Sequence, residues 1–314
     1  MGWMKFALSE GIAKSVGSFF QKIVGKVMET VEMGCVAGII IGTVQMIGGL
    51  IGFVHGARKD PEHISALVPD IRSVSWALLF GFFAAIPGTV WSVYTFTLGA
   101  DLAIRTLLIS CAIIPGAVIG RIIWKDPLGI WEVMGIVVFL AAVWAMFDFT
   151  FAFPLWAWAV LVITFTQPIN EALSRAASVK LNIWVNNFWV GVSTVFCCLT
   201  LLAVLGFLWG GVQLNLSKMF LFGSIVIGGI VLGMISFKLL AYAGGGTIAL
   251  KKLVMQGTYL VTAAIGGILF FNEPMTVGKV IGILLFPIAL ALSDRAARSY
   301  IFSVLRRQPK EETV

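Results

Sequence analysis

Long apolar runs separated by short polar breaks set the pattern of this chain. Nine runs are clear, and each is long enough to cross a hydrocarbon core of about 30 Å as a helix. They lack the alternation of β-barrel strands, and only helices and closed barrels satisfy their backbone groups in lipid, so the pattern predicts membrane helices. The runs cover residues 33–55, 74–100, 106–124, 128–149, 154–176, 184–210, 218–242, 248–271 and 277–296.

A tenth segment, 3–28, is less apolar than the others. Its structure is either a spanning helix with a polar face toward a cavity or an amphipathic helix that lies in the membrane interface. Counted as a spanning helix, it brings the expected fold to an all-α integral membrane protein with ten transmembrane helices. The ionisable residues of this segment are Lys5, Glu10, Lys14, Lys22 and Lys26.

The chain also repeats itself. Residues 124–143 read WKDPLGIWEVMGIVVFLAAV and residues 271–290 read FNEPMTVGKVIGILLFPIAL, at an offset of 147 residues. In both, an acidic residue and a proline precede a helix with an aligned glycine. Two halves of five helices each must have opposite orientations, which predicts inverted repeats. The expected units are a first repeat in residues 1–150, a second repeat in residues 151–298 and a tail in residues 299–314.

Composition and charge agree with lipid as the main solvent. Of the 314 residues, 59% are hydrophobic and only 12% are charged, against about 25% charged in soluble proteins, and the mean hydropathy is +0.99. The net charge of +7 lies between apolar runs, so it indicates membrane orientation and not nucleic-acid binding.

The basic residues of the loops divide unequally between the two sides. By the positive-inside rule, the richer side and both termini are expected in the cytoplasm of a cell whose inner or plasma membrane holds the protein. The richer set is Arg58, Lys59, Arg72, Arg121, Lys125, Arg175, Lys180, Lys251, Lys252, Arg306 and Arg307. The poorer set is Lys22, Lys26, Arg105, Lys218 and Lys279.

The end of each half resembles the drug/metabolite transporter superfamily, in particular its EamA-like domain, present here in two copies. The residues that carry the resemblance are Glu273-Pro274-Met275-Thr276 with Gly282, and Asp126-Pro127-Leu128 with Gly135. The resemblance implies ten helices, a central cavity between the halves and alternating access. Glu273 is expected to have a local structural role, such as capping the following helix, and is not placed in the site.

Ionisable and polar residues at bilayer depth are the candidates for substrate binding, because burying them in lipid is costly. Glu10 with Lys14 and Glu171 with Arg175 are each spaced four residues apart, so each pair can close on one helix face. The acids therefore either neutralise the neighbouring bases or line the cavity, where one takes a proton during transport. The candidate substrate-binding residues are Glu10, Lys14, Trp91, Tyr94, Asn170, Glu171, Lys238, Gln256 and Tyr259.

The packing alternative remains for each uncharged candidate, since membrane helices also use such groups to hold one another. Lys238 has a further alternative, because a lysine near a helix end can extend its ammonium group to the interface. No metal or cofactor is expected: the four cysteines lie in apolar runs, and neither His55 nor His63 lies in a catalytic constellation. No P-loop is present, so direct use of ATP is not expected, and neither is an enzyme.

Three functions follow from these observations. The leading hypothesis is a secondary active transporter, most simply an exporter, of a small organic metabolite or amino acid, with proton coupling as one option. The second is an antiporter of nucleotide sugars or phosphorylated metabolites, which would depend on Lys238 and Lys252. The third is a lipid-handling or scaffold protein, in which these residues tolerate alanine. The expected partners are the solute and membrane lipids, and a homodimer is compatible with the sequence.

Overall fold

The computed structural model describes residues 2–59, 66–112, 129–150, 154–178, 181–212, 214–244, 248–293 and 298–299. These residues form helices and short connections and contain no strand, which confirms the all-α prediction. The helices are α1 (Gly2–Val27), α2 (Val31–Lys59), α3 (Ile71–Ala85), α4 (Trp91–Thr97), α5 (Leu102–Ser110), α7 (Ile130–Met146), α8 (Leu155–Ser178), α9 (Ile183–Trp209), α10 (Lys218–Ala243), α11 (Ile248–Phe271) and α12 (Val277–Ser293).

Each predicted run overlaps at least one of these helices. The run 74–100 divides into α3 and α4, because a π-helical turn at Ile86–Val90 separates them. Pro87 lies in this turn and has no backbone N–H to donate, so the regular hydrogen-bond ladder is interrupted there. In the run 106–124 the described helix ends at Ser110, and residues 113–128 lie outside the described part.

Five helical stretches of the described chain are both long and apolar enough to cross a membrane. They are Val31–Lys59, Ile71–Thr97, Ile183–Trp209, Lys218–Ala243 and Val254–Phe271. Helices α1 and α8 are long enough but carry ionisable residues, whereas α7 and α12 contain shorter apolar stretches. The composition of the described helices is therefore compatible with a membrane protein whose interior contains polar groups.

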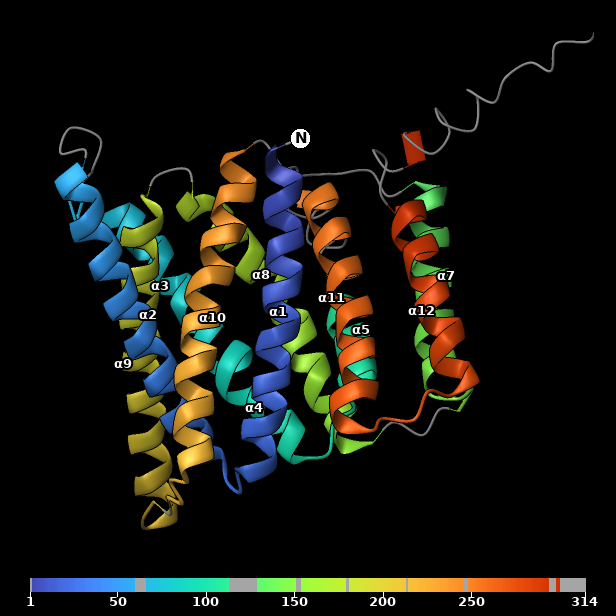
Figure 1. Ribbon diagram of the computed structural model, residues 1–314, viewed down its shortest axis with the longest axis horizontal. Coiled ribbons are helices and arrows are strands. Elements are labelled where there is room, and N and C mark those ends of the chain that lie inside the picture. Colours follow the sequence, from blue (N-terminus) through green and yellow to red (C-terminus); the bar gives the residue numbers. More distant parts are fainter. Residues whose placement is uncertain are drawn as a thin grey trace, which may run out of the picture.

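The helices pack mainly in pairs from opposite halves of the chain. Helix α2 lies along α9, α1 lies along α10 and α11, and α7 lies along α12. In Figure 1, α1 stands between α10 and α11, while α2 with α9 and α7 with α12 lie toward opposite sides of the molecule. The core is therefore assembled from helices that are distant in sequence.

Glycines allow a close approach between α2 and α9. A Cβ atom on Gly49 would lie 2.5 Å from the backbone nitrogen of Phe188. A Cβ atom on Gly191 would lie 2.5 Å from the backbone nitrogen of Met46. Small residues at such positions let two helix backbones approach closely, as is common between membrane helices.

The position of α1 distinguishes between the two structures expected for segment 3–28. Glu10, Ser15, Ser18 and Lys22 are all buried within the helix bundle. A helix lying in an interface would instead expose its polar face to water. The packing therefore favours α1 as a full member of the bundle, with its polar face turned inward.

Candidate functional site

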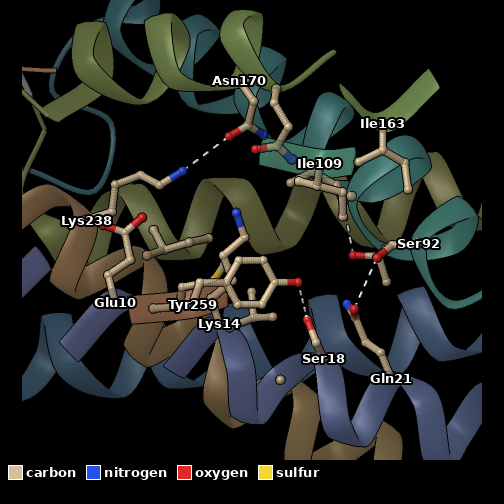
Figure 2. Close-up of a pocket in the computed structure, with 18 of the residues that line it drawn as sticks. Glu10, Lys14, Ser18, Gln21, Ser92, Ile109, Ile163, Asn170, Lys238 and Tyr259 are labelled. Atoms are coloured by element: carbon tan, nitrogen blue, oxygen red, sulfur yellow. Dashed lines mark hydrogen bonds between the residues drawn. The ribbon is translucent and has the colours of Figure 1, made fainter. Parts of the chain in front are cut away.

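A cavity of about 110 Å³ lies between helices of both halves. Its wall is built by α1, α3, α4, α5, α8, α10, α11 and the π-helical turn. Six of the nine candidate residues lie in this wall, namely Glu10, Lys14, Asn170, Glu171, Lys238 and Tyr259. Figure 2 shows Glu10 and Lys238 toward one end of the cavity and Gln21 and Ser92 toward the other, with Tyr259 between them.

The first end, here called the paired end, consists of Glu10, Glu171, Lys238 and Lys251. The Lys251 ammonium lies 2.7 Å from a Glu10 carboxylate oxygen and 3.5 Å from a Glu171 oxygen. The Lys238 ammonium lies 3.2 Å from the other Glu171 oxygen. Two acids and two bases thus alternate, so the formal charges of the paired end balance within the protein.

Polar neighbours hold this chain of ion pairs in place. The Tyr242 hydroxyl donates to Glu171 over 2.6 Å, and Lys238 donates to the side-chain oxygen of Asn170 over 3.4 Å. Lys251 has no exposed side-chain surface, and its charge is satisfied by carboxylates and by the ring of Tyr242 at 4.9 Å. The lysine is therefore a structural member of the cluster.

The partner of Glu10 differs from the local pair that the helix spacing allows. Glu10 pairs with Lys251 of α11, and the ammonium of Lys14 instead lies 4.8 Å from the centre of the Tyr259 ring. Within the described residues Lys14 makes no ion pair with Glu10. The side chain of Arg175 lies outside the described part. Long-range pairing, and not the i, i+4 spacing, therefore decides the environment of Glu10.

The second end, here called the arginine end, consists of Arg105, Ser92, Gln21 and Ser18. The guanidinium of Arg105 donates from Nε to the Thr95 hydroxyl over 3.0 Å and from Nη2 to the Ser92 hydroxyl and backbone oxygen. Its central carbon lies 4.4 Å from the centre of the Phe96 ring. Arg105 is only 1% exposed, so its charge lies in the interior.

Further hydroxyl and amide groups continue this end along α1. The Ser92 hydroxyl donates to the side-chain oxygen of Gln21 over 3.1 Å. The hydroxyls of Ser18 and Tyr259 lie 2.7 Å apart. No carboxylate takes part in these described hydrogen bonds, which distinguishes the arginine end from the paired end.

Three candidate residues lie outside the cavity wall. The Trp91 ring nitrogen donates to the backbone oxygen of Ala159 over 2.8 Å, and its ring packs against Tyr94 with centroids 5.8 Å apart. Gln256 accepts a hydrogen bond from Ser110 over 3.2 Å. Their contacts are those of groups that join neighbouring helices, and their binding of a substrate stays a prediction.

Two central residues of the site, Lys251 and Arg105, are missing from the candidates. Arg105 falls just outside the predicted run 106–124, and Lys251 lies near the start of the run 248–271 but is counted there with the loop charges that set orientation. The assignment of both to the loop charges is wrong, because both are buried in helices. Arg105 could have been found from its sequence, since Ala103-Ile104-Arg105-Thr106-Leu107 places an ionisable group inside an apolar run. Lys251 follows the glycine-rich sequence Gly244-Gly245-Gly246, and nothing local distinguishes it from an interfacial lysine.

A second ion cluster lies beyond the cavity, near the start of α5. A Glu273 oxygen accepts from the Leu102 backbone nitrogen over 2.8 Å and pairs with Lys22, and Lys279 lies 2.5 Å from Asp101. The pKa of Glu273 lies above its ordinary value, mainly because the carboxyl group is buried and also because the Asp101 carboxylate is near. The ammonium group of Lys22 acts in the opposite direction and lowers this pKa. Glu273 thus caps α5 and not the following helix, whose first turn is capped by the Thr276 hydroxyl.

The described residues contain no group of three histidine, cysteine or acidic side chains placed to hold a metal ion. The expectation that no metal or cofactor takes part therefore stays a prediction. The chemistry that the described cavity offers is that of charged and hydrogen-bonding side chains.

Comparisons with known proteins characterise the fold and not the solute. No family model matches the sequence, and no curated protein matches it. A solved structure described as "Crystal structure of protein" aligns with 95% of this chain and 98% of its own, with a TM-score of 0.60 and 13% sequence identity. At this identity the likeness shows that the fold over nearly the whole chain is one found in another protein.

Proposed function

We propose that this chain is a secondary active transporter, acting as an exporter of a small organic metabolite or amino acid by alternating access. The observation that carries the proposal is the cavity between the halves, with Glu10 and Glu171 buried in its wall. Membrane transporters with inverted repeats typically bind their solutes at the interface between the repeats. Buried ionisable groups in membrane segments commonly mark such pathways.

The packing of the helices supports ten spanning helices in two inverted repeats. In two inverted repeats α1 corresponds to α8, α2 to α9, α3 to α10 and α5 to α11. The contact of α3 with α9 then corresponds to that of α10 with α2, and the contact of α1 with α11 corresponds to that of α8 with α5. All four contacts occur. Exchanging the halves also maps the pairs α2–α9 and α7–α12 onto themselves. A two-fold relation between the halves accounts for this pattern. Membership of the EamA-like family and cytoplasmic termini belong to the same proposal.

The size and charge of the cavity favour a small solute over a nucleotide sugar. In the present conformation about 110 Å³ is free, whereas one water needs roughly 10–15 Å³ measured in this way. This is room for several waters or a small metabolite, and a nucleotide sugar is several times bulkier. Lys238, which the nucleotide-sugar alternative requires, is already paired with Glu171, and the side chain of Lys252 lies outside the described part.

The proposal is tested by uptake into liposomes that contain the purified protein. Amino acids, small organic acids and nucleotide sugars would be offered with and without a pH gradient. We expect uptake of a small solute, driven by the gradient, and a loss of at least about tenfold in Glu10→Gln and Glu171→Gln. Glu29→Gln, an exposed acid between α1 and α2, is the matched control and is expected to keep full uptake.

The same assay separates the alternatives. Uptake of nucleotide sugars alone would favour the antiporter of phosphorylated solutes. Uptake of no solute above the level of empty liposomes, by protein that is correctly folded, would exclude a transporter of these solutes and leave the lipid-handling or scaffold alternative.

A further inference from the structure

The buried basic residues of the described chain differ in how their charges are balanced. Five such residues are buried: Lys22, Arg105, Lys238, Lys251 and Lys279. Each of the four lysines forms an ion pair with a carboxylate of the protein. Arg105 forms no ion pair with any described carboxylate, although it is among the most deeply buried of the five.

All described hydrogen-bond partners of the Arg105 guanidinium are neutral. Its Nε and Nη2 atoms donate to Thr95 and Ser92, and the Tyr259 hydroxyl is a further side-chain partner. Arg105 also belongs to the wall of the cavity. A buried charge without a counterion is costly, and structural charges in protein interiors are normally paired. The geometry therefore leaves room for a counterion that is not part of the protein.

We propose that the arginine end is the subsite for a carboxylate group of the transported solute, which supplies the missing counterion of Arg105. This inference rests on the proposed transport function and names the chemical class of its solute. A guanidinium presents its N–H groups in a planar fork that matches the two oxygens of a carboxylate. The amide nitrogen of Gln21, which has no acceptor among the described residues, is a second donor at this end.

The surroundings of Arg105 indicate the rest of the solute. Ile109 and Ile163 form an apolar part of the wall close to the arginine end, as Figure 2 shows. A small organic acid therefore places its carboxylate at Arg105 and its hydrocarbon part against these side chains. The two acids and two lysines of the paired end balance one another, so these lysines already have carboxylate partners within the protein.

A carboxylate fits this site better than a phosphate. Arg105 supplies one positive charge, which one carboxylate balances. A phosphate monoester carries a charge between about −1.5 and −2 at neutral pH, which is more than the single charge of Arg105 balances. Lys14, the other basic residue of the wall without an ion pair in the described chain, has its ammonium over the Tyr259 ring.

The test uses four probes that each contain four carbon atoms in an unbranched chain and differ in the polar group. Butyrate, butyramide, butylammonium and butyl phosphate are titrated onto the detergent-purified full chain while its thermal unfolding is followed. A ligand that binds only the folded state raises the unfolding temperature with its concentration. We expect butyrate to give the largest shift and Arg105→Gln to weaken its binding by about tenfold or more.

Two further variants separate binding from folding. Lys218→Gln removes a basic residue from the exposed start of α10 and is the matched control, expected to bind butyrate as the unchanged protein does. Arg105→Lys keeps the charge but loses the planar fork, and is expected to bind more weakly than the unchanged protein. Without ligand, Arg105→Gln is expected to unfold at the same or a higher temperature, because it removes an unbalanced buried charge.

A role of Arg105 in stability alone predicts the opposite results. Unfolding of Arg105→Gln at a much lower temperature, with butyrate binding unchanged in Arg105→Lys, would overturn the inference. A larger shift with butylammonium or with butyl phosphate than with butyrate would also overturn it. Butyrate binding that depends on Arg105, in a protein that moves no solute into liposomes, would keep the carboxylate site and reject the transporter.

Discussion

The two ends of the cavity differ in whether their buried charges have counterions within the protein. At the paired end, Glu10, Lys251, Glu171 and Lys238 alternate in sign and satisfy one another. At the arginine end, a single guanidinium is surrounded by hydroxyls, an amide and an aromatic ring. Eight residues separate Glu10 from Ser18 on α1, a distance of roughly 12 Å along the helix axis.

This difference shows why counting charged residues in a cavity does not give its function. A balanced cluster contributes a defined arrangement of helices, since each ion pair joins two helices. An unbalanced charge contributes an electrostatic potential that a solute of opposite sign can use. The first kind of end holds the protein together, and the second is available for binding.

The largest expected effect comes from unbalancing the paired end. Lys251→Met leaves Glu10 as a buried carboxylate without its partner, and breaking a buried pair on one side costs about 3–5 kcal/mol. We expect the free energy of unfolding to fall by this amount in a denaturant titration. The double variant Lys251→Met with Glu10→Gln removes both charges and is expected to recover most of the loss. A loss as small as that of an exposed lysine would show that the pair is not balanced as described.

A smaller effect is expected from balancing the arginine end. Gln21→Glu places a carboxylate on the side chain whose oxygen already shares Ser92 with Arg105. A hydrogen bond to a charged group contributes about 1.5–3 kcal/mol, so we expect greater stability together with weaker butyrate binding. The isosteric change Gln21→Met, which adds no charge, is the control. Unchanged butyrate binding in Gln21→Glu would separate Arg105 from the binding site.

For Tyr242→Phe at the paired end, we expect a loss in the free energy of unfolding that is smaller again. The variant removes only the hydroxyl that donates to Glu171 over 2.6 Å. Because Glu171 keeps both lysines, the loss in the free energy of unfolding should be about 1.5 kcal/mol, the lower part of the range for a hydrogen bond to a charge. The measurement is the same denaturant titration, and a loss as large as that of Lys251→Met would indicate that the hydroxyl is indispensable to the cluster.

The smallest effect is expected for Asn170→Ala. The hydrogen bond from Lys238 to Asn170 is long, at 3.4 Å, and Lys238 retains Glu171 as its counterion. We expect a loss of about 0.5 kcal/mol, at the low end for a single hydrogen bond. A large fall in solute uptake with so little change in stability would place Asn170 in direct contact with the solute, as its sequence position first indicated.

The helices could be predicted closely because hydropathy is a local property. The run 184–210 corresponds to α9 at Ile183–Trp209, and the run 218–242 corresponds to α10 at Lys218–Ala243. The five long apolar stretches confirm helices compatible with a membrane, while ten spans in inverted repeats remain a proposal. The unit boundaries at residues 150 and 298 also stay predictions, and the tail 299–314 lies outside the described part except for its first residue.

The site could be predicted only where a residue's own position is unusual. Glu10 and Glu171 stand out as acids in helices, and both lie in the cavity wall. Their partner Lys251 does not stand out, because the ion pairs depend on how α11 packs against α1 and α8. Arg105 falls one residue before the run predicted to begin at 106, so a small error in a helix boundary moved a buried charge into a loop.

The long-range ion pairs of α1 have a consequence for biosynthesis. Glu10 and Lys22 belong to the first helix to be made, and their partners Lys251 and Glu273 follow 241 and 251 residues later. With the proposed spanning topology, α1 leaves the ribosome long before any group can neutralise its charges, and inserting such charges singly is unfavourable. Its amphipathic character then suits the membrane surface during synthesis, and its final place in the bundle becomes available only when α10 and α11 have been completed.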